Sequence, residues 1–340
     1  MKITGTERIR AALEGRRTDR VPYSFWTHLS AVDLDAEKLA EETIRFWKRY
    51  DLDFIKTMPN GMFSVEDMGC ECDYSEVANG GVAKVRKFAV KRPDDWLELA
   101  QPDIGKGALG RELRSLKLIL DHVRDEAPVV VTVFSPLTTA LKLCGPDLLA
   151  HMQQHPGKLR AGLEQITATA RQYARAAVEL GAAGIFFASQ TCGRDFLTEE
   201  EYKEFSLSYD YSILNEVRGR SWFNVIHIHG TDTHHRLLYD LPAQALNWHI
   251  GETAPSIAEF AQSNQDKLIV GGLNRMDITN GNLTALREQI REAVTSLHAR
   301  RRILAPGCTI RGPLRDRSLR QLSQMMQNIS SKEERNVHNM

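Results

Sequence analysis

The stretch Trp222–Gly230, W-F-N-V-I-H-I-H-G, predicts a buried strand that ends in two histidines. Residues i and i+2 of a strand point to the same face, so His227 and His229 are expected to lie side by side. A later apolar run at 303–304 leads into A-P-G-C, which ends at Cys308. Taken singly, these residues are more typical of structural side chains. Together, at matched strand ends, two imidazoles and one thiol favour a metal site with an open fourth position.

The pattern on either side of this stretch predicts an α/β fold, a single (β/α)8 TIM barrel. Eight strand candidates are each followed by a helical segment, and several are almost wholly apolar, as expected of strands buried on both faces. A doubly wound open sheet is disfavoured because no G-x-G-x-x-G follows any strand. The expected strands are 21–26, 53–58, 128–134, 184–189, 222–230, 245–250, 267–273 and 302–305.

The segment 62–108 is expected to be an insertion after the second strand, because it is too short and polar to carry its own core. An alternating stretch within it, near 82–90, is compatible with a small hairpin. The barrel is expected to occupy 1–330, followed by a mobile polar tail at 331–340. Helices are expected over 6–14, 36–50, 111–123, 159–180, 198–217, 233–239, 256–262, 283–298 and 314–328.

The composition indicates a cytoplasmic protein without a nucleic-acid or membrane partner. Of 340 residues 42% are apolar, and 44 basic residues balance 44 acidic ones, so no net field attracts nucleic acid or membrane. Five cysteines without disulfide density favour a reducing compartment. The start M-K-I-T-G-T-E-R-I-R lacks a secretory apolar segment, and no apolar run approaches the roughly 20 residues that span a bilayer. The oligomeric state is left open.

Polar residues gather at the expected C-terminal strand ends, where barrel enzymes place their chemistry. Four of the eleven histidines lie there, together with Cys308. His249 and His28 are expected to contact a small-molecule substrate or to form structural hydrogen bonds, rather than to bind the cation. Asn247 and Gln190 occupy neighbouring strand ends and are expected to shape the same catalytic pocket.

Several motifs resemble those of the uroporphyrinogen decarboxylase superfamily. They span nearly the whole chain in the same order, and the resemblance implies a (β/α)8 barrel. The motifs are E-R-I-R-A-A-L-E-G-R-R-T-D-R-V-P at 7–22, F-S-P-L-T-T-A at 134–140, the His-x-His-Gly strand, A-L-N-W at 245–248, G-G-L-N at 271–274 and L-A-P-G-C at 304–308.

The resemblance is closer to one of the two main branches of that superfamily. True decarboxylases carry R-Q-A-G-R after the first strand to hold the substrate carboxylates, whereas this chain has W-T-H-L-S at 26–30, without an arginine. The zinc methyltransferases, which move methyl groups between a corrinoid protein and a thiol such as coenzyme M, carry His-x-Cys and P-G-C. This chain is similar at His227 and Cys308 but has His229 in place of the first cysteine. An imidazole there makes a zinc site more positive and a bound thiolate less nucleophilic.

The leading hypothesis is therefore zinc-dependent methyl transfer at the C-terminal mouth of the barrel. Zinc is expected at His227, His229 and Cys308, with any corrinoid carried by a separate partner protein, because the chain has no room for a corrinoid domain. Two alternatives stay open. One is a metal-free decarboxylase acting on a porphyrinogen or a smaller acid, and the other is a non-catalytic barrel that binds a small molecule.

Overall fold

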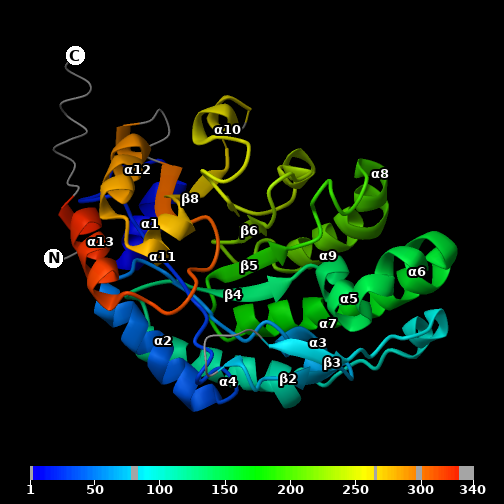
Figure 1. Cartoon of the computed structure of the whole chain (residues 1–340). Coiled ribbons are helices and arrows are strands. Elements are labelled where there is room, and N and C mark those ends of the chain that lie inside the picture. The colour runs from blue at the N-terminus through cyan, green and yellow to red at the C-terminus, as the bar shows by residue number, and fades with distance from the viewer. Residues whose placement is uncertain (1–2, 78–82, 264–265, 296–300, 329–340) are drawn as a thin grey trace.

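The computed structural model describes residues 3–77, 83–263, 266–295 and 301–328 of the chain (Figure 1). Its main sheet contains seven strands that pair in parallel and follow chain order around the sheet, with helices packed outside them. The predicted (β/α)8 barrel is confirmed. Its strands are β1 (Ile55–Lys56), β4 (Val129–Phe134), β5 (Gly184–Ser189), β6 (Val225–Ile228), β7 (Ala245–Trp248), β8 (Leu268–Leu273) and β9 (Arg302–Pro306).

The eighth position of the barrel is occupied by the segment 21–27, which is extended but forms no regular strand. The Ser24 N–H donates to the Leu304 carbonyl at 2.9 Å on one side, and the Asp53 N–H donates to the Tyr23 carbonyl at 2.9 Å on the other. The predicted strand over 21–26 is therefore wrong as a regular strand, although the segment closes the ring. Two of the backbone hydrogen bonds that a regular strand would make are absent. Pro22 has no N–H to donate, and the Tyr23 N–H donates to the Asp53 carboxylate at 2.8 Å instead of to a backbone carbonyl.

Local sequence signals determine where most helices begin. Thr4 caps α1 with a capping box, in which its side chain and that of Glu7 bond each other's backbone N–H groups. The prediction of a helix over 36–50 is confirmed, with Asp35 as its cap. The longer helices are α1 (Gly5–Leu13), α2 (Ala36–Tyr50), α4 (Gly107–Val123), α5 (Pro136–Cys144), α7 (Pro156–Glu179), α9 (Ser208–Glu216), α12 (Leu283–Thr295) and α13 (Asp316–Asn328).

Several shorter elements differ from the expected helices. The helix expected over 198–217 is divided by a π-helical turn at Lys203–Leu207, and the one expected over 233–239 is a 3-10 turn at His235–Leu238. The short helix α11, which directly follows β8, was not expected. The short helices are α3 (Phe63–Glu66), α6 (Leu148–Gln154), α8 (Glu199–Tyr202), α10 (Ile257–Ser263) and α11 (Arg275–Asn280).

The segment between β1 and α4 packs on the barrel rather than forming a core of its own. Its strands β2 (Glu71–Asp73) and β3 (Lys84–Lys87) pair antiparallel, so the stretch near 82–90 supplies only one arm of the hairpin. Trp96, on a 3-10 turn at Pro93–Glu98, is fully buried, and its indole N–H donates to His151 at 3.0 Å. This segment therefore depends on the barrel for burial of its largest side chain.

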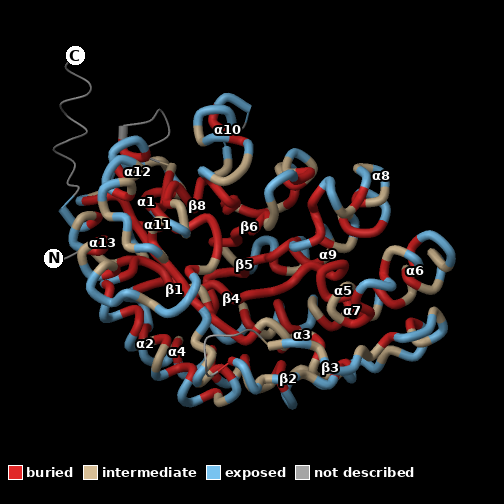
Figure 2. Tube along the Cα trace, viewed as in Figure 1, coloured by how far each residue is buried: buried red, intermediate tan, exposed pale blue. Residues whose placement is uncertain are grey.

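Burial follows the barrel plan, with buried strands inside and exposed outer helix faces (Figure 2). Every residue of β4, β5 and β6 is buried, which explains their nearly unbroken apolar sequences. Within the described ranges, no helix is long and apolar enough to cross a membrane. The tail predicted at 331–340 lies outside the described residues.

Candidate metal centre

Three histidines and one cysteine meet at the C-terminal ends of β6, β7 and β9. They are His227, His229, His249 and Cys308, and one ligand atom from each lies within 4.8 Å of the others. The Cys308 Sγ lies 3.7 Å from Nε2 of His227 and 3.7 Å from Nδ1 of His229. A tetrahedral zinc with ordinary bond lengths separates a sulfur and a nitrogen ligand by about 3.6 Å. The geometry therefore has the dimensions of a zinc site.

Strand register and one glycine bring these side chains together. His227 pairs in register with Asn247 on β7, so His249, two residues after Asn247, lies at the same mouth as the His227–His229 pair. The turn after β9 passes close to β7: a Cβ on Gly307 would lie 2.6 Å from the Trp248 carbonyl oxygen. A glycine at 307 is therefore required for Cys308 to reach the histidines.

The nitrogen and sulfur donors of this cluster are suited to a cation, and the surroundings of His249 support this interpretation. This residue is only 2% exposed, yet neither ring nitrogen has a hydrogen-bond partner among the described residues. A buried polar group without a partner costs free energy, which a metal ion bound to one ring nitrogen would offset. Sequence reasoning assigned His249 to the pocket rather than to the cation, whereas the structure places it within the cluster.

Asn247 orients His227 from behind the cluster. The Asn247 side-chain amide donates to the carbonyls of Val270 and Pro306, at 2.6 and 3.0 Å, so its Oδ1 is the free acceptor. That oxygen lies 2.6 Å from Nδ1 of His227, which must therefore carry the ring proton. Nε2 is left unprotonated and faces Cys308, the orientation that a metal ligand needs. Asn247 thus positions a candidate ligand and does not line the cavity.

A carboxylate stands behind His249. The Glu252 Oε2 lies 3.9 Å from Nδ1 of His249. Glu252 is itself fixed by Arg275, which donates to both of its oxygens at 3.1 and 3.2 Å.

The electrostatics of the cluster favour the forms that bind metal. Burial alone would disfavour the Cys308 thiolate, but the electrostatic interaction with His227 outweighs this effect and holds the pKa of Cys308 well below its usual value. Burial lowers the pKa of His227, although the neighbouring Cys308 opposes this shift. A thiolate beside neutral imidazoles is the combination that binds zinc.

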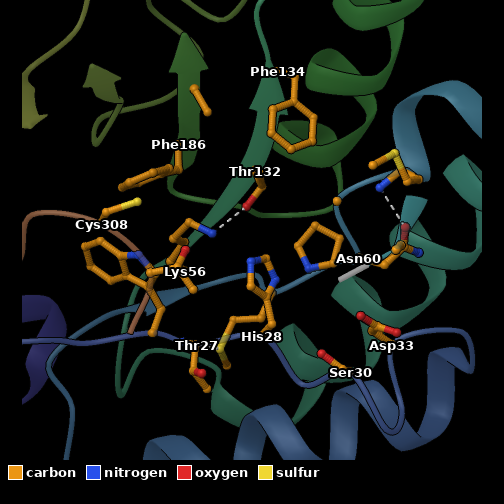
Figure 3. A pocket seen from close by; sticks show the side chains of 18 of the residues that line it. Thr27, His28, Ser30, Asp33, Lys56, Asn60, Thr132, Phe134, Phe186 and Cys308 are labelled. Atoms are coloured by element: carbon orange, nitrogen blue, oxygen red, sulfur yellow. Dashed lines mark hydrogen bonds between the residues drawn. The ribbon is translucent and has the colours of Figure 1, made fainter. Parts of the chain in front are cut away.

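A cavity of about 290 Å³ opens beside the cluster, with Cys308 and His227 at one end. His28 and Gln190 line this cavity, but neither belongs to the cluster of four. Figure 3 shows Cys308, Lys56, His28 and Asp33 following one another across the view. His28 is exposed where it lines the cavity, and partial desolvation by the surrounding protein, together with the charge of Lys56, lowers the pKa of this histidine.

Sequence reasoning missed three charged residues of the cavity, Lys56, Lys142 and Asp33. The lysines left a signal, because each interrupts an apolar stretch, D-F-I-K-T-M for Lys56 and T-A-L-K-L-C for Lys142. A lysine inside an apolar pattern is costly unless it faces a cavity or a partner. Asp33 lies in an ordinary polar loop sequence and left no such signal.

The fold and the cluster together define a class: a barrel enzyme with a histidine–cysteine site at its C-terminal mouth. The family model described as uroporphyrinogen decarboxylase (URO-D) matches residues 4–329. The chain belongs to this family, as its motifs indicated.

The relatives lie in the methyltransferase branch. A methylcobamide:CoM methyltransferase, MtbA of Methanosarcina acetivorans, is 22% identical over 323 residues, covering 91% of this chain and 93% of that protein. MtbA of Methanosarcina mazei is 22% identical over 252 residues, covering 70% and 74%. Among solved structures, a methyltransferase from Methanosarcina mazei has a TM-score of 0.81 at 20% identity, covering 96% of this chain and 98% of that one. The protein is therefore an enzyme, and its relatives support methyl transfer.

Proposed function

We propose that the protein is a zinc-dependent methyltransferase that activates a thiol acceptor at the cluster of His227, His229, His249 and Cys308. The observation that carries the proposal is the buried His249, whose ring nitrogens are unpartnered among the described residues although it lies in one cluster with His227, His229 and Cys308. Zinc held there would lower the pKa of a thiol bound to it and so supply a thiolate at neutral pH.

The four donors differ in how firmly the protein holds them. Asn247 fixes His227, and Cys308 contacts both His227 and His229. His249 lacks a hydrogen bond within the described part of the chain, so it would be the least firmly held of the four donors. His249, with the Glu252 carboxylate 3.9 Å from its Nδ1, would be placed to accept the proton of an incoming thiol.

Transfer of the methyl group to a thiolate requires no oxidant or reductant. The sulfur lone pair of the thiolate forms the new S–CH3 bond, and the electron pair of the broken donor–methyl bond stays with the donor. The relatives' name, methylcobamide:CoM methyltransferase, supports a methylated corrinoid as that donor. We propose that it is carried by a separate corrinoid protein.

The cavity gives little support to porphyrinogen decarboxylation. Its described lining contains lysines but no arginine, and it lacks the bidentate groups that pair best with several carboxylates.

The metal is tested by purifying the protein without a histidine tag and measuring zinc by mass spectrometry. We expect one zinc per chain in the wild type, loss of zinc in Cys308→Ala, and retained but weaker zinc in His249→Gln. Methyl transfer from methylcobalamin to coenzyme M, followed by the change in corrinoid absorbance, then tests the reaction. Absence of zinc above background in the wild type would refute the proposal.

A further inference from the structure

One wall of the cavity contains a buried carboxylate that the fold does not pair. Asp33 lies in the loop before α2 and is 2% exposed, and its Oδ1 has no hydrogen-bond partner among the described residues. It lines the cavity on the side away from Cys308, beyond His28 in the view of Figure 3. A buried carboxylate without a partner costs free energy, so a partner from outside the fold would stabilise it.

The arginine that acts on Asp33 is already engaged by two other carboxylates. Arg111 donates to both oxygens of Glu66, at 2.9 and 3.3 Å, and to Glu112 at 3.3 Å. Burial raises the pKa of Asp33 to about 7, and the negative charge of Glu66 adds to this shift while Arg111 opposes it. The ionised form of Asp33 is therefore left without a positive charge of its own.

The two lysines of the cavity do not supply that charge. Nζ of Lys56 donates to Oγ1 of Thr132 at 3.0 Å, and Nζ of Lys142 donates to the Gly61 carbonyl at 2.8 Å. Within the described chain, no lysine, arginine or histidine nitrogen lies within 4.0 Å of the Asp33 carboxylate. A cation that pairs with Asp33 must therefore come from a ligand.

The surroundings of Asp33 favour an organic ammonium ion over a metal ion. A bound Ca²⁺ takes about six to eight oxygen ligands, whereas Asp33 is the only carboxylate in the described lining of the cavity. A primary ammonium is stabilised by a charge-assisted hydrogen bond to a single carboxylate. The same lining offers the hydroxyl of Ser30 as a second acceptor, and the apolar side chains of Met62 and Val77 can cover an alkyl chain.

We propose that the Asp33 side of the cavity is a binding site for the primary ammonium group of an organic ligand. The ammonium donates to the Asp33 carboxylate, and the alkyl part of the ligand lies against the apolar lining. The site contains no residue of the metal cluster, so this inference does not depend on the proposed function.

The inference is tested by titrating the full-length protein with n-butylammonium and with 1-butanol, and by measuring both affinities by saturation-transfer NMR. The two probes have the same length and differ only in the charged group. A buffer of about pH 8 keeps both partners charged, because it lies above the pKa of Asp33, about 7, and below that of a primary amine. We expect the ammonium to bind at least about tenfold more tightly than the alcohol, because a hydrogen bond between charged groups contributes that much affinity.

A pair of variants assigns the preference to Asp33. Asp33→Asn keeps the shape of the side chain and removes its charge, so it should abolish the preference for the ammonium. Asp121→Asn, at an exposed site on α4 where Asp121 pairs with Lys117 at 3.0 Å, is the matched control and should retain it. Removal of zinc with a chelator should also leave the preference unchanged. Equal affinity for the two probes in the wild type, or a preference that survives in Asp33→Asn, would overturn the inference, and the wild-type comparison does not depend on the folding of any variant.

Discussion

Nδ1 of His227 lies 2.6 Å from Oδ1 of Asn247, and the two residues face each other in register on neighbouring buried strands. The Asn247 amide is held by two backbone carbonyls, so the ring cannot rotate without breaking this bond. The tautomer of His227 is thus determined by a residue that never reaches the cavity.

We expect Asn247→Leu to weaken zinc binding by about 10- to 100-fold, because the ring of His227 loses the acceptor that orients it. Competition with a zinc indicator dye measures this loss. The substitution also leaves two carbonyls without a donor, so the melting temperature of the metal-free protein is measured in parallel. A drop in metal-free stability with unchanged zinc affinity would assign Asn247 a purely structural role.

His229→Cys should retain zinc and increase the rate of thiol methylation. The substitution replaces a neutral ligand with a thiolate, which makes the site less positive and a bound thiol more nucleophilic. The number of zinc ions bound per chain measures zinc retention, and single-turnover demethylation of methylcobalamin measures the rate of thiol methylation. Zinc retention with a slower reaction would show that the imidazole at 229 has another role than tuning the charge.

Gly162→Ala should destabilise the protein by about 1–3 kcal/mol, since a Cβ at this position of α7 would overlap the buried ring of Trp96. Gly157→Ala, in the same helix, is the matched control, because nothing lies within 4 Å of the added Cβ. The control should be neutral or stabilising by up to about 1 kcal/mol, as expected of alanine in a helix. Urea unfolding distinguishes the two variants, and equal effects would mean that Trp96 does not pack here.

The free energy of unfolding should depend on pH because of Asp210, and the substitution Asp210→Asn should remove this dependence. This residue is fully buried, with Oδ2 accepting from Tyr202 and Ser206, and burial raises its pKa to about 7. The pKa of Asp210 is higher in the folded state than in the unfolded state. Its contribution to the stability of the folded state is therefore complete below about pH 4 and is lost as the pH rises to about 7.

The size of this effect follows from the difference between the two pKa values. Over that range the free energy of unfolding of the wild type should fall by up to roughly 4 kcal/mol relative to Asp210→Asn. Chemical unfolding of both proteins between pH 4 and 8 measures the difference. A constant difference across this range would show that Asp210 stays ionised when buried.

The sequence by itself determined the elements that follow from local rules. The strand at Gly184–Ser189 and the helix at Ala36–Tyr50 have the predicted bounds, because continuous apolar runs, helical periodicity and an aspartate cap act over a few residues. The shared face of His227 and His229 follows in the same way from the two-residue period of a strand. The closeness of Cys308 to this pair followed from the parallel barrel, whose strand ends meet at one mouth.

Only the tertiary structure decided the surroundings of that pair. His249 joins the cluster because of the register between β6 and β7 and the close passage of Gly307, neither of which any short stretch specifies. The cavity unites Asp33, Lys56 and Lys142 from three distant segments. The segment 21–27 fails to form a regular strand because a side chain 30 residues away, that of Asp53, takes the Tyr23 N–H. Contacts between residues far apart in the chain depend on how whole elements pack, and periodicity does not encode them.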